Sequence, residues 1–141
     1  MVEVINRQRR RPMDCERWRE FAEGALGEIG ANAEGATIVF VSDRAVRDLN
    51  RRFRGRNQAT DVLSFPAERA AFEKPEEVNL GDVVVSVERA TAQAAEHGLE
   101  FDEEVAQLIL HGLLHLFGYD HETDHGEMNR LELRLRRRLG I

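Results

Sequence analysis

The sequence predicts a single domain of mixed α and β structure over residues 1–141. Four short segments are apolar and rich in β-branched residues, which is typical of strands. Several longer segments repeat their apolar residues at helical spacing. One of them, from Leu108 to Phe117, is apolar nearly all round, so we expect it at the centre of the domain. A chain of 141 residues, 42% of them hydrophobic, is long enough to bury a substantial core.

The four expected strands are bounded by different signals. The segments at 36–42 and 82–86 are β-branched and largely apolar, which indicates buried strands, whereas a proline ends the strand over 60–66. A shorter candidate covers residues 2–5. The charged segment 67–79 has no clear period and contains a proline, so we expect a loop there.

Five segments are predicted to be helices because their apolar residues recur every three or four positions. Asp14, Asp43 and Ser86 each precede such a segment, and their side chains can accept hydrogen bonds from the first turn. Gly30 and Gly98 suit C-terminal ends. The expected helices cover residues 14–29, 43–53, 87–98, 101–117 and 125–139.

The charge is unevenly distributed along the chain. The net charge of −6 argues against a general nucleic-acid binder, but residues 1–60 carry +3 and residues 61–141 carry −9. Nearly all basic residues are arginines, and they gather in runs at 7–11, 51–56 and 134–138. A single run of this kind is usually solvated surface. Three runs of arginine, which binds phosphate through two parallel hydrogen bonds, make phosphate contact plausible.

Cysteine usage and hydropathy give an expectation for the compartment. Cys15 is the only cysteine, so an internal disulfide is impossible, which fits a reducing cytoplasm. No apolar run approaches the roughly 18 residues of a membrane span. The first residues lack the apolar core of a secretory signal. We therefore expect a cytoplasmic protein without a membrane partner.

The string HGLLHLFGYDH at 111–121 predicts a metal site. His111 and His115 lie four residues apart on an expected helix, so their imidazoles point the same way. Gly118 allows a sharp turn, after which His121 can return as a third nitrogen ligand. Three protein nitrogens leave a fourth position open, which is typical of catalytic rather than structural metal sites.

One position separates this string from the metzincin protease motif H-E-x-x-H-x-x-G-x-x-H. Gly112 stands where those enzymes carry the glutamate that acts as general base. Peptide hydrolysis at zinc needs such a base, which glycine cannot provide. A phosphodiester gathers negative charge on its phosphoryl oxygens instead, so a metal and a well-placed arginine supply much of what its cleavage requires.

Three segments resemble the YbeY family of bacterial endoribonucleases, which are rRNA maturation factors. The string HGLLHLFGYDH matches the family signature H-G-x-L-H-L-x-G-Y-D-H at every defined position. LNRRFRGRNQATDVLSFP at 49–66 and LGDVVVS at 80–86 match two further blocks in the same order. The resemblance implies an α+β fold with a metzincin-like metal site. Its small mixed sheet, of about four strands, packs with about five helices around a central helix that carries the histidines.

The family pattern also assigns roles to residues of this chain. It implies that His111, His115 and His121 hold one divalent metal ion. Three imidazoles accept several metals, and zinc is the one we expect. Arg54 and His111 are the expected catalytic residues, with Arg54 beside the metal.

Further residues receive secondary roles. We expect Arg52, Arg56 and Ser64 to contact the substrate and Asp120 to hydrogen-bond a ligand histidine from behind. Residues 57–59 read Asn-Gln-Ala and depart from the family loop, in which a proline precedes the threonine. The loop therefore loses a stiff residue.

The resemblance implies a specific activity and specific partners. The activity is single-strand-specific, metal-dependent endoribonuclease cleavage in rRNA processing, especially maturation of the 3′ end of small-subunit (16S) rRNA, and in ribosome quality control. The expected partners are precursor rRNA, the small ribosomal subunit with its proteins, and the GTPase Era.

Two other functions and the identity of the base stay open. A metalloprotease is suggested by the histidine spacing and opposed by Gly112. A non-enzymatic ribosome-assembly factor with a structural metal is opposed by the open fourth position. Candidate bases are Tyr119, Asp120, Asp61 and a metal-bound hydroxide.

Overall fold

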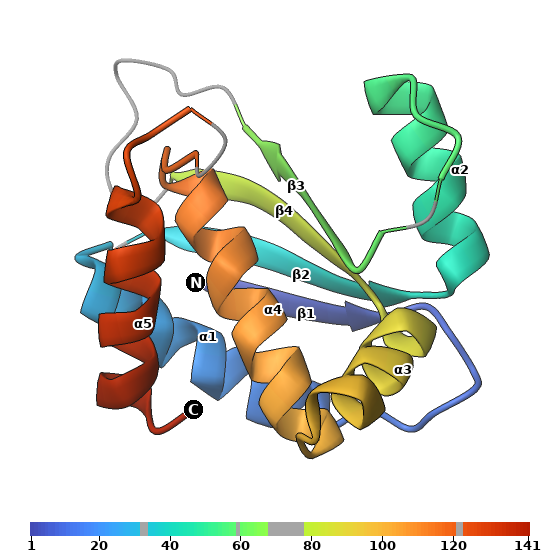
Figure 1. Cartoon of the computed structure of the whole chain (residues 1–141), viewed down its shortest axis with the longest axis horizontal. Coiled ribbons are helices and arrows are strands. Elements are labelled where there is room, and N and C mark those ends of the chain that lie inside the picture. Colours follow the sequence, from blue (N-terminus) through green and yellow to red (C-terminus); the bar gives the residue numbers. More distant parts are fainter. Residues whose placement is uncertain (32–33, 59, 68–77, 121–122) are drawn as a thin grey trace.

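The computed structural model confirms the predicted fold class: one small α+β domain with a four-stranded mixed sheet (Figure 1). It describes residues 1–31, 34–58, 60–67, 78–120 and 123–141. The strands are β1 (Val2–Asn6), β2 (Gly35–Val41), β3 (Val62–Pro66) and β4 (Asn79–Ser86). The helices are α1 (Cys15–Ile29), α2 (Asp43–Arg54), α3 (Val87–His97), α4 (Phe101–Leu116) and α5 (Glu127–Leu139).

Of the loop predicted over 67–79, residues 68–77 lie outside the described residues, and Asn79 already belongs to β4. None of the helices in the described ranges combines the length and the apolar character that crossing a membrane requires.

The sheet places β3 at an edge. The strand order is β1-β2-β4-β3. β2 pairs in parallel with β1 and β4, whereas β3 runs antiparallel to β4, with Ser64 opposite Val83 and Leu63 opposite Val84. Because side chains alternate along a strand, Ser64 faces one side of the sheet while Leu63 and Phe65 face the other.

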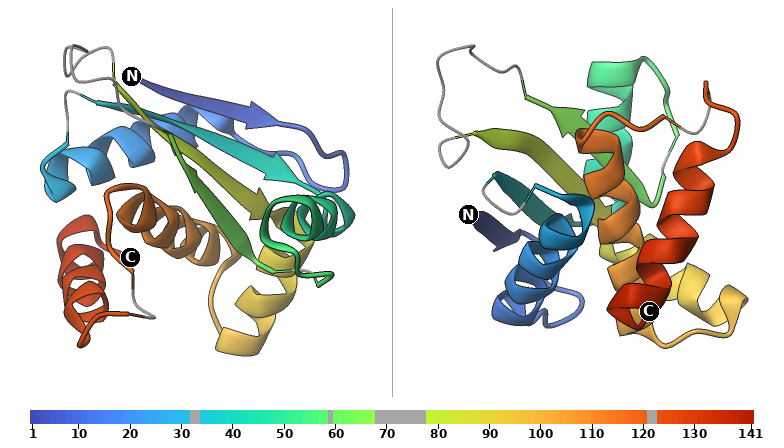
Figure 2. Two further views of the ribbon diagram at one scale, coloured as in Figure 1. Left: turned by 90° about the horizontal axis from the view of Figure 1, so that it is seen from above. Right: turned by 90° about the vertical axis from the view of Figure 1, so that its left-hand side faces the viewer.

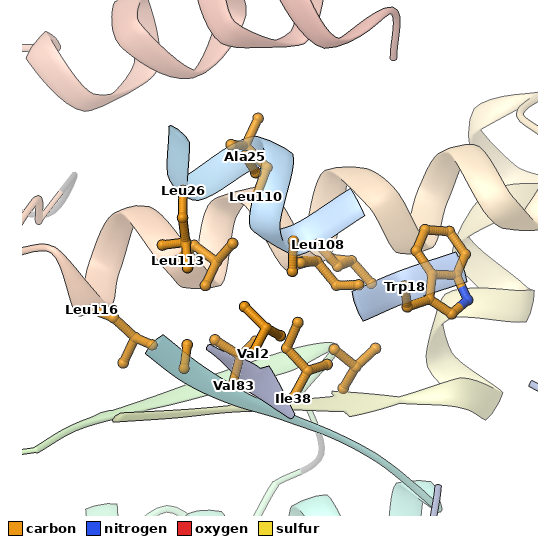
Figure 3. Packing of buried hydrophobic residues seen from close by; sticks show 14 of the residues in the cluster. Val2, Trp18, Ala25, Leu26, Ile38, Val83, Leu108, Leu110, Leu113 and Leu116 are labelled. Atoms are coloured by element: carbon orange, nitrogen blue, oxygen red, sulfur yellow. The ribbon is translucent and has the colours of Figure 1, made fainter. Parts of the chain in front are cut away.

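The two faces of the sheet bury cores of different size. Helices α1, α4 and α5 lie on one side of the sheet (Figure 2), and the large core fills the space between them. Leu110 and Leu113 of α4 belong to this core together with Ile38 and Val83 of the sheet (Figure 3). On the other face, α2 inserts Val46 into a small cluster with residues of β2, β3 and β4. The expectation that α4 is the central helix is therefore confirmed.

Helix α4 lies close to the sheet at Gly112. A Cβ atom at this position would lie 2.5 Å from Cγ1 of Val83 and 3.3 Å from the hydroxyl oxygen of Ser64. The Ser64 hydroxyl donates a hydrogen bond to the Gly112 carbonyl at 3.0 Å. Glycine is thus the only residue that fits here without a shift of the helix or of β4.

The first turn of α2 differs from the expectation. The Ser42 hydroxyl accepts a hydrogen bond from the Ala45 amide at 3.2 Å, so the cap predicted at Asp43 was wrong by one residue. Strand β2 ends at Val41, which leaves Ser42 extended and able to cap. The Asp43 carboxylate instead accepts a hydrogen bond from the Ser86 hydroxyl at 3.1 Å, and this bond ties α2 to the end of β4.

Helix α5 begins two residues later than predicted. The Asp124 carboxylate accepts hydrogen bonds from the amides of Gly126 at 2.8 Å and Met128 at 2.9 Å. Gly126 has a φ of 94°, a left-handed conformation that interrupts a helix. The side chain of Asp124 therefore caps a helix that starts at Glu127.

The contact at Gly112 predicts a measurable cost for a single methyl group. Gly112→Ala should lower the free energy of unfolding by about 1–3 kcal/mol, because the new Cβ overpacks the contact with Val83. Gly24→Ala in α1 is the matched control, since nothing lies within 4 Å of its Cβ position. The control should raise stability by about 0.4–1 kcal/mol. Urea unfolding of both variants tests this, and equal stabilities would contradict the close approach.

Candidate active site

Two histidines on α4 bring their ring nitrogens together. The Nε2 atoms of His111 and His115 are 3.2 Å apart, and the rings meet edge to face with centroids 4.7 Å apart. Both side chains are half-buried. One helical turn separates them, so the rigid helix fixes their relative position.

The separation of the two nitrogens fits a shared metal ion. Zinc binds imidazole nitrogen at about 2.0–2.1 Å in tetrahedral geometry, which places two ligand nitrogens roughly 3.3 Å apart. His121, the third expected ligand, lies outside the described residues. Within the described ranges, no group of three or more His, Cys, Asp or Glu side chains gathers around one point. The described residues thus contribute two nitrogen donors.

A buried carboxylate holds His111 from behind. Nδ1 of His111 lies 2.6 Å from Oε1 of Glu132, whose residue is only 7% exposed. Because a carboxylate accepts, the imidazole donates its Nδ1 proton and keeps the lone pair of Nε2. Nε2 is the atom that meets His115, so Glu132 sets the tautomer that a metal ligand needs.

Arg136 completes this arrangement on α5. Its guanidinium donates to Oε2 of Glu132 at 2.5 Å. Burial by itself would raise the pKa of Glu132, but the hydrogen bond from His111 and the charge of Arg136 outweigh it and lower the pKa below its usual value. Glu132 is therefore a carboxylate whose two oxygens both have partners.

The histidines form one wall of a cavity of about 530 Å³. The opposite wall comes from β3, from the end of α2 and from the loop that joins them. Asn50 of α2 is buried, and its side-chain amide donates to the carbonyl of Gln58 at 2.9 Å. This bond fixes the loop at Gln58.

Arg54 ends α2 and reaches the edge of β3. Gly55 follows in the left-handed conformation with a φ of 66°, so the helix ends there. The Arg54 guanidinium donates to the Ser64 carbonyl at 2.9 Å, and its central carbon lies 6.0 Å from the centre of the Phe65 ring. Arg54 lines the cavity that contains both histidines.

The structure separates the other expected substrate contacts. Arg56 and Ser64 line the cavity with Arg54. The Ser64 hydroxyl is buried and already donates to Gly112. Arg52 does not line the cavity; its Nε lies 3.2 Å from a carboxylate oxygen of Asp48. The phase of α2 explains the difference, since residues two apart on a helix point to nearly opposite sides.

The candidate bases all border the same space. Asp61, Tyr119 and Asp120 line the cavity. The Asp61 carboxylate also accepts a hydrogen bond from the Val62 amide at 2.8 Å. Because all three side chains line one cavity, their position does not select one of them as the base.

Sequence reasoning missed Glu132, to which the geometry gives a supporting role behind His111, and the supporting role expected for Asp120 stays a prediction. The only signal in the sequence was a glutamate that adjoins the apolar face of the last helix and stands four residues before Arg136. Such pairs are common on exposed helices, so this signal did not distinguish Glu132 from surface residues.

The fold and site define an α+β domain whose central helix carries a histidine pair facing an arginine across a sheet edge. The family model for endoribonuclease YbeY matches residues 3–140, and the chain belongs to this family. The resemblance seen in the sequence is thereby confirmed.

Relatives and a solved structure agree with this membership. Endoribonuclease YbeY of Geobacter sulfurreducens is 36% identical over 136 residues, which cover 96% of this chain and 91% of the relative. The Solibacter usitatus protein of the same name is 43% identical over 121 residues, covering 86% and 76%. The solution structure of TM1509 from Thermotoga maritima superposes with a TM-score of 0.63 at 25% identity, covering 99% of this chain and 89% of that one.

Proposed function

We propose that this chain is a metal-dependent endoribonuclease that cleaves single-stranded RNA. The observation that carries the proposal is the placement of His111, His115 and Arg54 around one cavity. Membership of the family and the shared name of its relatives support hydrolysis of RNA as the reaction.

The proposed metal ligands are His111, His115 and His121. The spacing of the first two nitrogens supports zinc, although other divalent metals accept the same ligands. When bound, such a metal supplies Lewis acidity that polarises a phosphoryl oxygen.

Three other residues of the chain have proposed roles in substrate binding, charge stabilisation and support of a metal ligand. The Arg54 guanidinium, already oriented by the Ser64 carbonyl, holds a phosphoryl oxygen and stabilises the negative charge that grows during cleavage. Glu132 accepts a hydrogen bond from Nδ1 of His111 and so leaves Nε2 as the nitrogen that would bind the metal. Arg56 extends the positive surface along the same cavity.

The biological setting follows from the family and is likewise a proposal. We infer that the substrate is precursor rRNA, near the 3′ end of the small-subunit rRNA, and that the enzyme takes part in ribosome quality control. The small ribosomal subunit with its proteins and the GTPase Era are the proposed partners, in the cytoplasm.

A protease activity meets two obstacles in the described residues. Extended peptides are commonly held by adding a strand to a sheet edge, but the Ser64 carbonyl on the β3 edge already accepts from Arg54. A glutamate at position 112 would be directed against Val83 rather than into the cavity. The two obstacles do not bear on a non-enzymatic assembly role, which activity measurements test.

One set of reactions separates the three functions. The purified protein should cut an RNA oligonucleotide with both ends blocked, so that only internal cleavage gives products, and should leave casein intact. Removal of metal by a chelator should abolish cutting and added zinc should restore it. His115→Ala should retain almost no metal by elemental analysis and should be inactive. Casein cleavage with intact RNA would establish a protease, and no reaction with either substrate would favour the assembly factor.

The arginines of residues 51–56 give a second prediction. Arg54→Ala should lower kcat by roughly 10²–10³, and Arg54→Lys should recover little because lysine lacks the two-pronged geometry. Arg52→Ala is the matched control, since Arg52 belongs to the same helix turn but pairs with Asp48 outside the cavity. It should keep kcat and weaken RNA binding slightly, in a salt-dependent way. Equal turnover of the two alanine variants at saturating RNA would remove Arg54 from the active site.

A third prediction distinguishes Glu132 from Asp120 as the residue that supports the metal ligand. Glu132→Gln keeps the shape but loses the carboxylate that receives the His111 proton, so metal affinity should fall roughly 10- to 100-fold. Asp120→Asn should change it much less. Competition with a coloured chelator measures both affinities without reference to activity. A large loss in the Asp120 variant alone would contradict the role of Glu132 and support the role that the sequence predicts for Asp120.

A further inference from the structure

Phe53 is an aromatic side chain that the fold leaves in solvent. It is the penultimate residue of α2 and is 67% exposed. Its ring meets Phe65 of β3 edge to face, with ring centres 5.6 Å apart and planes at 69°. Phe65 supports one edge of the Phe53 ring, and most of that side chain remains open to a ligand.

This aromatic pair is connected to the proposed active site through Arg54. The guanidinium of Arg54 lies 6.0 Å from the Phe65 ring centre and also donates to the Ser64 carbonyl. Leu63 and Phe65 share the face of β3 that carries the small cluster, whereas Ser64 faces α4 and the cavity. Arg54 therefore lies beside the aromatic pair and also lines the cavity that contains the histidines.

The charges around Phe53 suit a polyanion. Arg51 and Arg52 come just before it and Arg54 just after. Arg51 and Arg52 share a single carboxylate, that of Asp48, at 2.7 and 3.2 Å, so positive charge remains in excess on this turn. A single-stranded nucleic acid is typically bound by cations that follow its phosphates and by aromatic rings that stack its bases.

A plainer explanation accounts for part of this pattern. Basic residues in a last helical turn complement the helix dipole, and the Phe53 ring covers Phe65. Covering Phe65 requires only an apolar group, however, and an aliphatic side chain would serve as well. Stacking requires an aromatic face, so the two explanations predict different behaviour for leucine and tyrosine at this position.

We propose that Phe53, supported by Phe65, stacks an unpaired RNA base next to the phosphodiester that Arg54 holds. This inference rests on the proposed function and deepens it, because it gives a physical origin for single-strand preference. A base inside a duplex is already stacked and paired, and its face cannot reach Phe53.

The test compares four variants on a single-stranded RNA oligonucleotide with blocked ends. Phe53→Ala and Phe53→Leu should both raise KM roughly 5- to 150-fold and leave kcat at saturating RNA unchanged. Phe53→Tyr should behave as the wild type. Leu133→Ala is the control, because Leu133 is also an exposed apolar residue, 43% exposed, but belongs to α5. It should leave KM unchanged.

A modified substrate locates the stacked base. A series of oligonucleotides is made in which each member lacks one base, at a different position beside the cleaved bond. For one member, the KM of the wild-type enzyme should equal the KM of Phe53→Leu with the complete oligonucleotide. With that substrate, Phe53→Leu should cause no further loss, since the partner of the ring is already absent.

The outcomes keep this inference separate from the proposed function. Wild-type KM for Phe53→Leu, or equal losses for every position of the missing base, would overturn the stacking platform while RNA cleavage stands. No RNA cleavage by the wild-type protein would overturn the proposed function itself. Thermal unfolding of each variant is the control for the fold: the unfolding temperatures should match that of the wild type, so that changes in KM report RNA binding.

Discussion

Helix α4 can lie as close to β4 as it does at position 112 because Gly112 has no side chain. A single added carbon would meet Val83 at 2.5 Å, and the Ser64 hydroxyl bonds the Gly112 carbonyl at the same place. This contact fixes the turn that carries His111 and His115 against the edge strand. Arg54 then binds the carbonyl of the same Ser64, so one residue of β3 sets the distance between the histidine pair and the arginine.

The same contact explains why a metzincin-like string lacks the metzincin base. Position 112 faces the sheet, and a glutamate there would enter a space that the side chain of Val83 fills. A general base from the protein must therefore come from outside position 112. Asp61, Tyr119 and Asp120 line the cavity as the candidate bases, and Arg54 lines it from α2, where its positive charge suits a phosphate.

Periodicity in the sequence was sufficient to locate the helices and strands, because each carries its own pattern, whereas the mixed sheet was implied by the family resemblance. The histidine pair was equally local, since four residues on a helix define its geometry. Glu132 was not predictable, because it joins His111 from 21 residues further along the chain and its burial arises only when α5 packs beside α4. Ser42 was missed because a cap depends on the residue at which the preceding strand ends. Arg52 and Arg54 were separable in principle by helix phase, once α2 is known to continue through Arg54.

Glu132 supports His111 from outside the cavity, and this placement suits an anionic substrate. Glu132, paired with Arg136, lies behind the ring and does not line the cavity. Its negative charge can fix the imidazole without facing a phosphate. Arg54 and Arg56 lie in front, where a phosphate would enter. A carboxylate in the cavity repels the phosphate that the arginines attract. Support of His111 from outside the cavity adds no negative charge to that of Asp61 and Asp120, which already line it.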